Sequence, residues 1–196
     1  MTPAIAYTML FAHFNKYTRM VHEDFEKCKR FFTVEKCKAY SAVIKPGATV
    51  TKQYFVAEGC LRTYLPDSAK NREYTIQFAV EEWWASDYIS YYNCTPSELC
   101  VECLEDCTLL SVKKQELELL YQQVPQLEFF FLRKLENAFV AFQKRILANL
   151  RNSAEDRYAD FLKQYPDIEQ RVKNYQIASY LGITPESLSR IRKARG

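Results

Sequence analysis

Glycine is scarce in this sequence of 196 residues. It occurs at only four positions, Gly47, Gly59, Gly182 and Gly196. A P-loop or a dinucleotide-binding fingerprint needs closely spaced glycines, because backbone N–H groups must approach a phosphate directly. The glycine-free stretch between Cys60 and Leu181 therefore excludes both motifs from that part of the chain.

Histidine is scarcer still, and His13 and His22 are its only occurrences. A metal-dependent enzyme of the β-barrel type needs two or three histidines inside the barrel, whereas both of these precede the segments that read as strands. Neither histidine lies near a plausible serine or cysteine nucleophile motif. We therefore expect that the protein is not an enzyme.

Long apolar runs are missing, since no stretch approaches the 18 uninterrupted apolar residues of a membrane span. The N-terminus lacks the cationic region of a secretory signal. Seven cysteines, an odd number, occur in a chain without an export signal, which favours free thiols over a disulfide framework. We expect a soluble, cytoplasmic protein with no membrane partner.

The cysteines at 94, 100, 103 and 107 are close enough in sequence to raise the possibility of a metal or iron-sulfur site. Strand alternation, however, places Cys100 and Cys103 on opposite faces, and free cysteine is commonly a small buried hydrophobe. We therefore predict no metal site and no cofactor.

Charge is distributed unevenly along the chain. Residues 1–132 hold 14 Lys/Arg and 17 Asp/Glu, whereas residues 133–196 hold 13 Lys/Arg and 7 Asp/Glu, within a total net charge of +3. A basic C-terminal third on an acidic remainder indicates that the tail meets a polyanion.

Hydrophobic periodicity divides the chain into regions. The first 40 residues have apolar positions three or four apart, which predicts short helices. Residues 39–112 contain short Val-, Tyr-, Phe- and Thr-rich segments separated by turn residues, typical of a β-sandwich or roll. Within that region, Gly59–Leu65 and Glu73–Phe78 should form a hairpin around a polar turn at 66–72, and Leu99–Leu110 another strand pair.

A long amphipathic helix is predicted from Pro125 to about Asn152. Additional apolar residues widen its hydrophobic surface beyond one stripe, so the helix should bury one face on the β region and another elsewhere. A second copy of the helix is the favoured partner, and an ordinary core crossing is the alternative. The positions predicted to face the partner are Phe131, Leu135, Ala138, Phe142 and Ile146.

The C-terminal segment has the pattern of a helix-turn-helix. Ser153 can cap a helix that ends near Tyr165. Further on, in YQIASYLGITPESLSRIR, Gly182 can end one short helix and Thr184 can cap the next. A plain helical corner in a core is the alternative, but the outward cations and serine of the last helix favour DNA binding.

The sequence resembles the family of the cyclic-AMP receptor protein and the fumarate-nitrate regulator (Crp/Fnr), particularly its divergent branch common in Bacteroidetes. The resemblance covers nearly the whole chain and depends on three segments, which are FVAEGCLRTYL, YTIQFAVEEWWASDYISYY and QIASYLGITPESLSRIRK. It implies an α+β transcription regulator in three parts. These are a cyclic-nucleotide-binding-like β-roll with N-terminal helices (1–124), a dimerisation helix (125–152) and a DNA-binding helix-turn-helix domain (153–196).

By position in the family motif, the recognition helix would be Pro185–Lys193, with Glu186, Ser187 and Arg190 toward base edges. The residues expected at phosphates are Gln176, Thr184, Arg192, Lys193 and Arg195. Many relatives have arginine where this chain has Pro185, which removes one base contact. Because the chain ends at Gly196, the usual β-hairpin wing is expected to be absent or reduced. A homodimer of this kind would bind an imperfectly palindromic operator in double-stranded DNA.

Cyclic-AMP-binding relatives hold the nucleotide with a segment containing Gly, Glu and an Arg-Ser or Arg-Thr pair. Here the equivalent residues, 81–88 and 95–98, contain neither glycine nor arginine and carry several carboxylates. A buried phosphate would be repelled there, so we predict that cyclic AMP does not bind tightly. A pocket for another small molecule, neutral or cationic, and a packed interior are both compatible with the segment. The residues that would line such a pocket are Arg62, Glu82, Trp83, Trp84, Asp87, Tyr88 and Ser97.

The sequence thus favours a homodimeric regulator whose β-roll senses an effector other than cyclic AMP. The alternative is a ligand-sensing or protein-interaction module that does not bind a specific operator, given Pro185 and the reduced wing.

Overall fold

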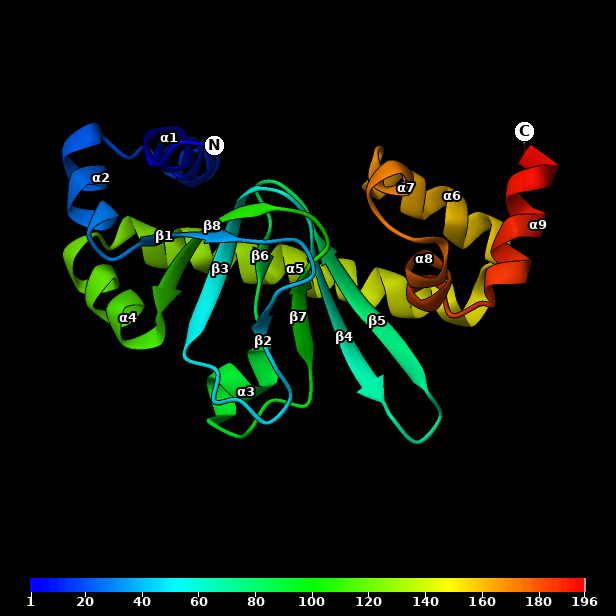
Figure 1. The fold of residues 1–196 in the computed structure, drawn as a ribbon. Coiled ribbons are helices and arrows are strands. Elements are labelled where there is room, and N and C mark those ends of the chain that lie inside the picture. Colours follow the sequence, from blue (N-terminus) through cyan, green and yellow to red (C-terminus); the bar gives the residue numbers. More distant parts are fainter. Residues whose placement is uncertain (196) are drawn as a thin grey trace.

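The computed structural model describes residues 1–195, and its strands form two four-stranded antiparallel sheets (Figure 1). One sheet has the order β1-β8-β3-β6 and the other β2-β7-β4-β5. Side chains from both sheets, among them Val56, Leu61 and Leu109, form a buried core between them, so the strands build a roll. The strands are β1 (Thr33–Cys37), β2 (Ala42–Ile44), β3 (Lys52–Glu58), β4 (Leu61–Asp67), β5 (Arg72–Ala79), β6 (Trp84–Ala85), β7 (Cys100–Cys103) and β8 (Cys107–Lys113).

The predicted hairpin is β4–β5, and its strands are longer than expected because Pro66 lies within β4 instead of in the turn. Proline has no N–H to donate to a sheet and is tolerated where that side has no partner strand. Strand β7 pairs with β4 only from Leu61 to Tyr64, so Pro66 has β5 on one side and no strand on the other in the described chain. The two strands predicted after Leu99 are present as β7 and β8, but the prediction that they pair is wrong. Strand β7 pairs with β2 and β4 in the second sheet, whereas β8 pairs with β1 and β3 in the first, because the chain crosses between the sheets at 104–106.

Gly59 connects β3 to β4 in a conformation that another residue would not fit. Its φ is +102°, and a Cβ atom there would lie 2.5 Å from the Cys107 Sγ atom and 2.9 Å from the Asp106 carbonyl oxygen. Both the left-handed backbone and the close approach of Asp106 and Cys107, where β8 begins, therefore require glycine.

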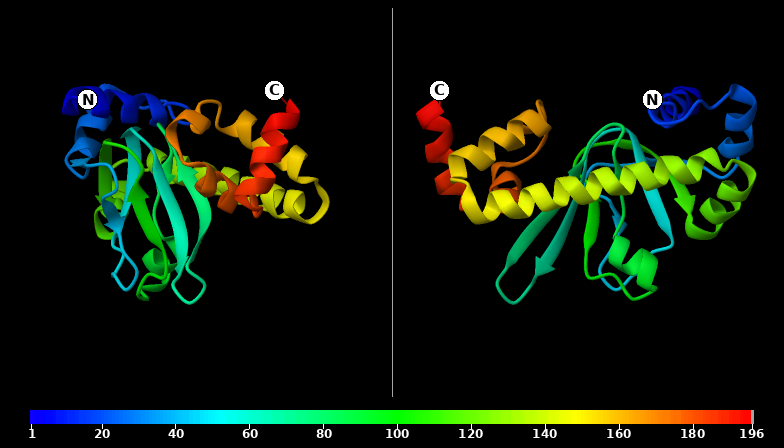
Figure 2. Two further views of the ribbon diagram at one scale, coloured as in Figure 1. Left: turned by 45° about the vertical axis from the view of Figure 1, so that its right-hand side comes forward. Right: turned by 180° about the vertical axis from the view of Figure 1, so that it is seen from behind.

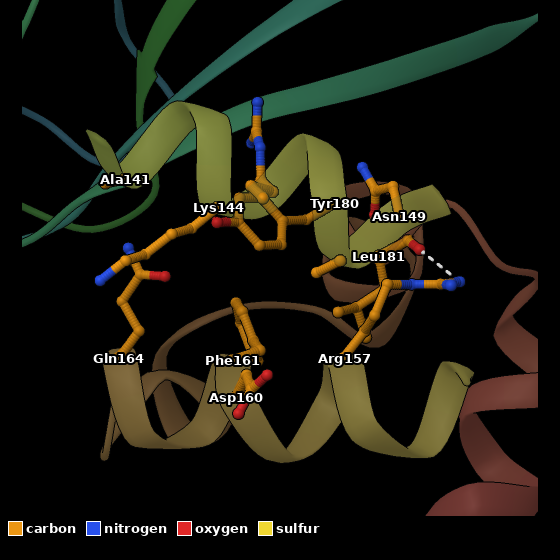
Figure 3. Close-up of a pocket in the computed structure, with 11 residues that line it drawn as sticks. Ala141, Lys144, Asn149, Arg157, Asp160, Phe161, Gln164, Tyr180 and Leu181 are labelled. Carbon is orange, nitrogen blue, oxygen red and sulfur yellow. Dashed lines mark hydrogen bonds between the residues drawn. The ribbon is translucent and has the colours of Figure 1, made fainter. Parts of the chain in front are cut away.

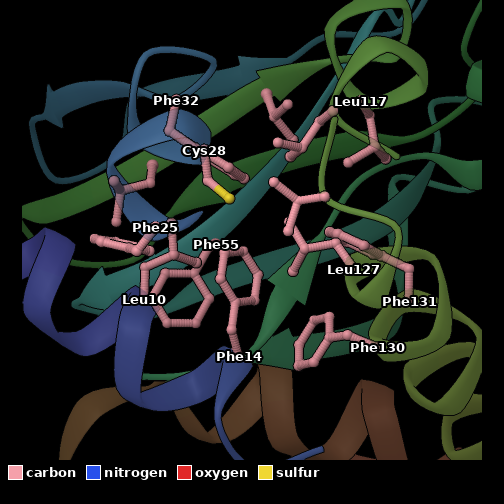
Figure 4. Close-up of a cluster of buried hydrophobic side chains, with 14 of the residues drawn as sticks. Leu10, Phe14, Phe25, Cys28, Phe32, Phe55, Leu117, Leu127, Phe130 and Phe131 are labelled. Carbon is pink, nitrogen blue, oxygen red and sulfur yellow. The ribbon is translucent and has the colours of Figure 1, made fainter. Parts of the chain in front are cut away.

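Helices α1 (Pro3–Phe14), α2 (His22–Lys29) and α4 (Lys114–Gln123) cover the outer face of the first sheet. Phenylalanines from α1, α2, β3 and the start of α5 meet in this cluster (Figure 4). The first 40 residues therefore form two helices as predicted, but they also contain β1, which pairs with β8.

A short helix, α3 (Tyr88–Asn93), lies inside the region predicted to contain only strands. The Asp87 carboxylate caps it by accepting hydrogen bonds from the N–H groups of Ile89 at 3.0 Å and Ser90 at 3.2 Å. The helix ends at Cys94, whose φ is +56°. These caps outweigh the strand preference of the three tyrosines in the segment.

The long helix, α5 (Gln126–Arg151), is 26 residues long and agrees with the predicted range. Only its first two turns are buried, through Leu127, Phe130 and Phe131, which pack under α1. It then runs along one side of the roll and on to the C-terminal helices (Figure 2).

The C-terminal helices are α6 (Ala154–Gln164), α7 (Ile168–Arg171), α8 (Asn174–Leu181) and α9 (Pro185–Arg195). They pack on the outer face of the second sheet, where Phe78 of β5 joins their hydrophobic cluster. The Tyr165 hydroxyl donates to the Phe78 carbonyl at 3.1 Å, and the N–H of Thr75 donates to the Ser179 hydroxyl at 2.8 Å. The helix-turn-helix domain, residues 153–195 and called the HTH unit below, is thereby fixed to the roll of its own chain.

Candidate nucleic-acid interface

Helices α8 and α9 form a helix-turn-helix whose turn follows the sequence prediction. Gly182 ends α8 with φ +68°, and the N–H of Ile183 donates to the Ala178 carbonyl at 3.0 Å. The Thr184 hydroxyl caps α9 by accepting the Ser187 N–H at 3.2 Å. The apolar sides of both helices are buried, through Ile177, Ala178, Leu181, Leu188 and Ile191. The opposite side of α9 is left facing outward.

That outward face of α9 carries Glu186, Ser187, Arg190 and Lys193, at the spacing of one helical side. Arg190 is exposed, and its Nη2 donates to the Ser187 hydroxyl at 3.2 Å, so the two side chains are held next to each other. The backbone N–H at the helix start lowers the pKa of Glu186, assisted by the Thr184 hydroxyl and Arg190. The face therefore offers a guanidinium donor, an ammonium, a hydroxyl and a carboxylate acceptor, which are the groups that read base edges and phosphates.

Two residues predicted to contact phosphate are engaged inside the HTH unit. The Gln176 side chain is only 3% exposed and accepts the Lys173 N–H at 2.9 Å, which caps α8. Arg192 forms an ion pair with Glu169 and donates to the Tyr158 hydroxyl at 3.1 Å and to Asn174, so it ties α9 to its neighbours. We correct the prediction for both residues and leave them out of the interface. The Arg195 side chain, also expected at a phosphate, lies outside the described residues.

The predicted dimer face of α5 is exposed in the single chain, with one exception. Leu135, Phe142 and Ile146 are 42–51% exposed, and Ala138 is exposed as well. Phe131 is instead buried against Trp84 and Phe14, which corrects its assignment to that face. Other large apolar side chains extend the exposed surface, and these are Phe129, Leu132, Phe139, Val140, Leu147 and Leu150.

The residues predicted to line an effector pocket are distributed over separate environments. Arg62 is fully buried on the outer side of the second sheet, where it pairs with Glu73 and Glu102 and stacks on Tyr175 of α8. Trp83 also turns toward the HTH unit, at 5.3 Å from the Tyr165 ring.

The other predicted pocket residues have structural partners on the roll. Trp84 packs between Phe55 and Phe131, Glu82 pairs with Lys16, and Ser97 donates to Asp87 at 2.7 Å. Tyr88 stacks on Tyr92 beside α5. These positions correct the prediction of one shared pocket, because a residue's place in the motif did not reveal which side of the sheet it faces.

Lys134 of α5 lies close to several of these aromatic rings. Its Nζ atom lies 4.2 Å from the centre of the Trp84 ring and 5.0 Å from that of Phe131, and it donates to the Gln53 amide oxygen at 3.1 Å. The Lys134 side chain of the chain itself thus lies against the aromatic side chains for which a neutral or cationic small molecule and a packed interior were both compatible with the sequence. Lys134 was not predicted at this site, because helical periodicity alone does not show which turn of α5 meets the roll.

His13 is a buried residue with a hydrogen-bond partner in the core. His13 is buried, and its Nε2 accepts the Trp84 indole N–H at 3.2 Å. Burial lowers the pKa of His13 to about 4, with Lys16 contributing, so the ring is neutral at pH 7.

In the described part of the chain, no group of three or more His, Cys, Asp or Glu side chains is arranged to hold a metal ion. Among residues 1–195, none of the helices combines the length and the apolar composition that a membrane span requires.

Taken together, a two-sheet roll, a long helix and a terminal helix-turn-helix define the fold of Crp/Fnr-type regulators. FixK2 from Bradyrhizobium japonicum is similar, with a TM-score of 0.71, 19% identity, and coverage of 83% of each chain. The global regulator CLP from Xanthomonas campestris has a TM-score of 0.69 and 14% identity, covering 89% of this chain and 91% of its own.

A crp/fnr-family protein from Eubacterium rectale has a TM-score of 0.66 and 17% identity, covering 91% of this chain and 87% of its own. No protein-family model matches the sequence, and no curated protein matches it. The chain therefore has the Crp/Fnr fold over most of its length, at low sequence identity.

Proposed function

We propose that the protein is a homodimeric, sequence-specific DNA-binding transcription regulator that acts in the cytoplasm and catalyses no reaction. The main observation in support of this proposal is the outward face of α9. Its polar side chains stand on a helix whose apolar side is buried, and Arg190 is exposed beside Ser187. The fold shared with CLP, a global regulator linked to virulence gene expression, and with the crp/fnr-family transcriptional regulator from Eubacterium rectale supports the same function.

The exposed apolar face of α5 supports the dimer. Many large apolar side chains exposed along one helix indicate a surface that binds a partner, and a second copy of α5 offers the same side chains. In such a dimer the two copies of α9 would enter successive major grooves about 34 Å apart. The proposed operator is therefore an imperfect palindrome.

We propose that the effector, where one acts, is not cyclic AMP. The segment that holds the nucleotide in cyclic-AMP-binding relatives here forms β6 and α3, and its Asp87 carboxylate is occupied by Ser97 and by the start of α3. Titration calorimetry of the full chain with cyclic AMP should detect no binding at micromolar concentrations. Micromolar binding would contradict this part of the proposal.

Selection of duplexes from a random pool, followed by fluorescence anisotropy, tests the central claim. The full chain should enrich a palindromic site and bind it at least about a thousandfold more tightly than random duplex at moderate salt. The logarithm of the affinity should fall linearly with the logarithm of salt concentration. Failure to enrich any site would instead favour a ligand-sensing or protein-interaction module without a specific operator.

A further inference from the structure

A cavity of about 380 Å³ lies between the C-terminal half of α5 and helices α6 and α8 (Figure 3). Its walls come from the long helix and from the HTH unit together. The volume falls in the range of small-molecule sites. None of the effector-pocket residues predicted from the sequence lines it.

The middle of the cavity is apolar and its ends are polar. Phe161 and Tyr180 lie in the middle, with Lys144 and Gln164 at one end and Arg157 at the other (Figure 3). Small side chains on α5, at Ala141 and Ala148, leave the space open.

Positive charge in the cavity is not neutralised. Among the described residues, Lys144, Arg145 and Arg157 form no ion pair with a carboxylate. The one carboxylate in the lining, Asp160, pairs with Lys163 outside it. Arg157 donates to the carbonyls of Asn152 at 2.9 Å and Leu181 at 3.2 Å.

The Nε atom of Arg157 is buried without a hydrogen-bond partner among the described residues. Arg157 nevertheless keeps its positive charge close to the cavity, and this charge and that of Lys144 attract an anion. The positive charge therefore favours an anionic occupant over a neutral one.

We propose that this cavity binds a small organic acid. The apolar body of the acid would lie between Phe161 and Tyr180, and its carboxylate would meet the Lys144 ammonium and the Gln164 amide. Dimerisation would leave the site open. With 3.6 residues per helical turn, Ala141 and Ala148 lie on the side of α5 away from Phe139.

Occupancy would hold the HTH unit to the long helix, because the ligand touches α5, α6 and α8 at once. The ligand site does not depend on the proposed DNA binding, since it is defined by the cavity alone. Its test can therefore be carried out without DNA, and the two proposals can fail separately.

Titration calorimetry of the full chain with 2-naphthoate, and with the neutral 2-naphthamide as a matched probe, tests the proposal. We expect naphthoate to bind at one site per chain, and naphthamide to bind at least about tenfold more weakly because it lacks the charge. Lys144→Gln should weaken naphthoate binding about fivefold. Arg151→Gln, which removes an exposed cation of α5 outside the lining, should leave binding unchanged.

Ala148→Trp fills the cavity without altering its charge and should abolish binding. If circular dichroism shows that this variant does not fold, Ala141→Leu serves the same purpose. Three outcomes would overturn the proposal: no naphthoate binding at millimolar concentrations, equal binding of naphthamide, or wild-type affinity in both Lys144→Gln and the cavity-filling variant. The last would place the probe on the exposed apolar face of α5.

Discussion

Arg190 and Lys193 share the exposed face of α9 but differ in chemistry. A guanidinium can donate two parallel hydrogen bonds to guanine, whereas an ammonium acts mainly as a point charge toward phosphate. We expect Arg190→Ala to cost about 1 to 3 kcal/mol on the selected operator and to relax discrimination at one base pair. Lys193→Ala should weaken all duplexes alike and reduce the salt slope by about one.

Anisotropy titrations on the selected operator and on random duplex, at several salt concentrations, distinguish these two effects. Equal losses on both duplexes for both variants would contradict the assignment of Arg190 to base edges. Glu169→Gln provides a control, because it weakens the Arg192 ion pair without touching the outward face.

His13 should make the stability of the protein depend on pH. Its pKa is about 4 when folded, lowered by burial and by Lys16, whereas an exposed histidine has a pKa of 6.5. As the pH falls below 6.5, the unfolded chain binds a proton that the folded chain does not. The free energy of unfolding should therefore decrease between pH 6.5 and 4 by up to about 3 kcal/mol from this residue.

Urea unfolding of the wild type and of His13→Gln across this pH range isolates the contribution. Glutamine keeps an acceptor for the Trp84 indole N–H but does not titrate. The difference in free energy of unfolding between the two proteins should shrink as the pH falls. Parallel curves would show that His13 is not the group responsible.

Single residues were predictable from the sequence where their role is local. Gly182 and Thr184 end and cap neighbouring helices, and both roles follow from the residue type and its place between two apolar patterns. Arg192 was not predictable in this way, because its partner Glu169 is 23 positions away in the sequence and on another helix. A cation on a short helix looks the same in sequence whether it faces DNA or a neighbouring carboxylate.

At the scale of elements, the α5 face gives a direct prediction about assembly. Phe139 is 60% exposed in the middle of the apolar surface, so Phe139→Glu would bury a charge in a dimer interface. We expect the dimer dissociation constant to rise at least about a hundredfold. Sedimentation equilibrium measures it, with Asn137→Glu on the polar side of α5 as the control. A dimer of unchanged affinity in Phe139→Glu would show that another surface forms the contact.

The turn between β3 and β4 gives a second prediction. Gly59→Ala would place its Cβ within 3 Å of Asp106 and Cys107, so we expect a loss of about 2 kcal/mol or more in the free energy of unfolding. Gly47→Ala is the matched comparison, since Gly47 also has a positive φ but no atom within 4 Å of a Cβ, and should cost about 1 kcal/mol. Equal losses in urea unfolding would show that strain alone, and not the contact with β8, makes Gly59 necessary.

Helices and strands whose hydrophobic pattern repeats over many residues were predicted from the sequence, whereas the helix that depends on a single capping residue was not. The β4–β5 hairpin, the existence of two strands after Leu99 and α5 all follow from alternation or helical spacing over many residues, whereas the sheet to which each of those two strands belongs did not. Helix α3 depends on one carboxylate, Asp87, and its tyrosines suit a strand equally well. The face on which Arg62 lies was likewise hidden, because strand alternation gives two faces without saying which one the HTH unit covers.

At the scale of the whole molecule, the order of the parts could be read from the sequence, but their docking could not. Arg171 of α7 donates to Glu81 at 2.8 Å and to Glu105 at 2.5 Å, and both carboxylates belong to loops of the roll. Glu81 also accepts the Gly59 N–H at 2.9 Å. Arg171 is 66 positions from Glu105 and 90 positions from Glu81 in the sequence. Hydrophobic periodicity relates only neighbouring positions, so it could not predict these two ion pairs.

This ion-pair group should control how firmly the HTH unit is held. Arg171 is 22% exposed, so its two pairs are partly desolvated, and we expect Arg171→Ala to raise the rate of amide hydrogen exchange in α8 about fivefold or more. Exchange in α1, on the other side of the roll, should not change. Lys163→Ala, which breaks an exposed pair within α6, is the control. Unchanged exchange in α8 would mean that the apolar contacts of Phe78 and Tyr165 hold the HTH unit without the ion pairs. The position of α9 relative to its dimer partner would then be set by packing, and would depend little on salt.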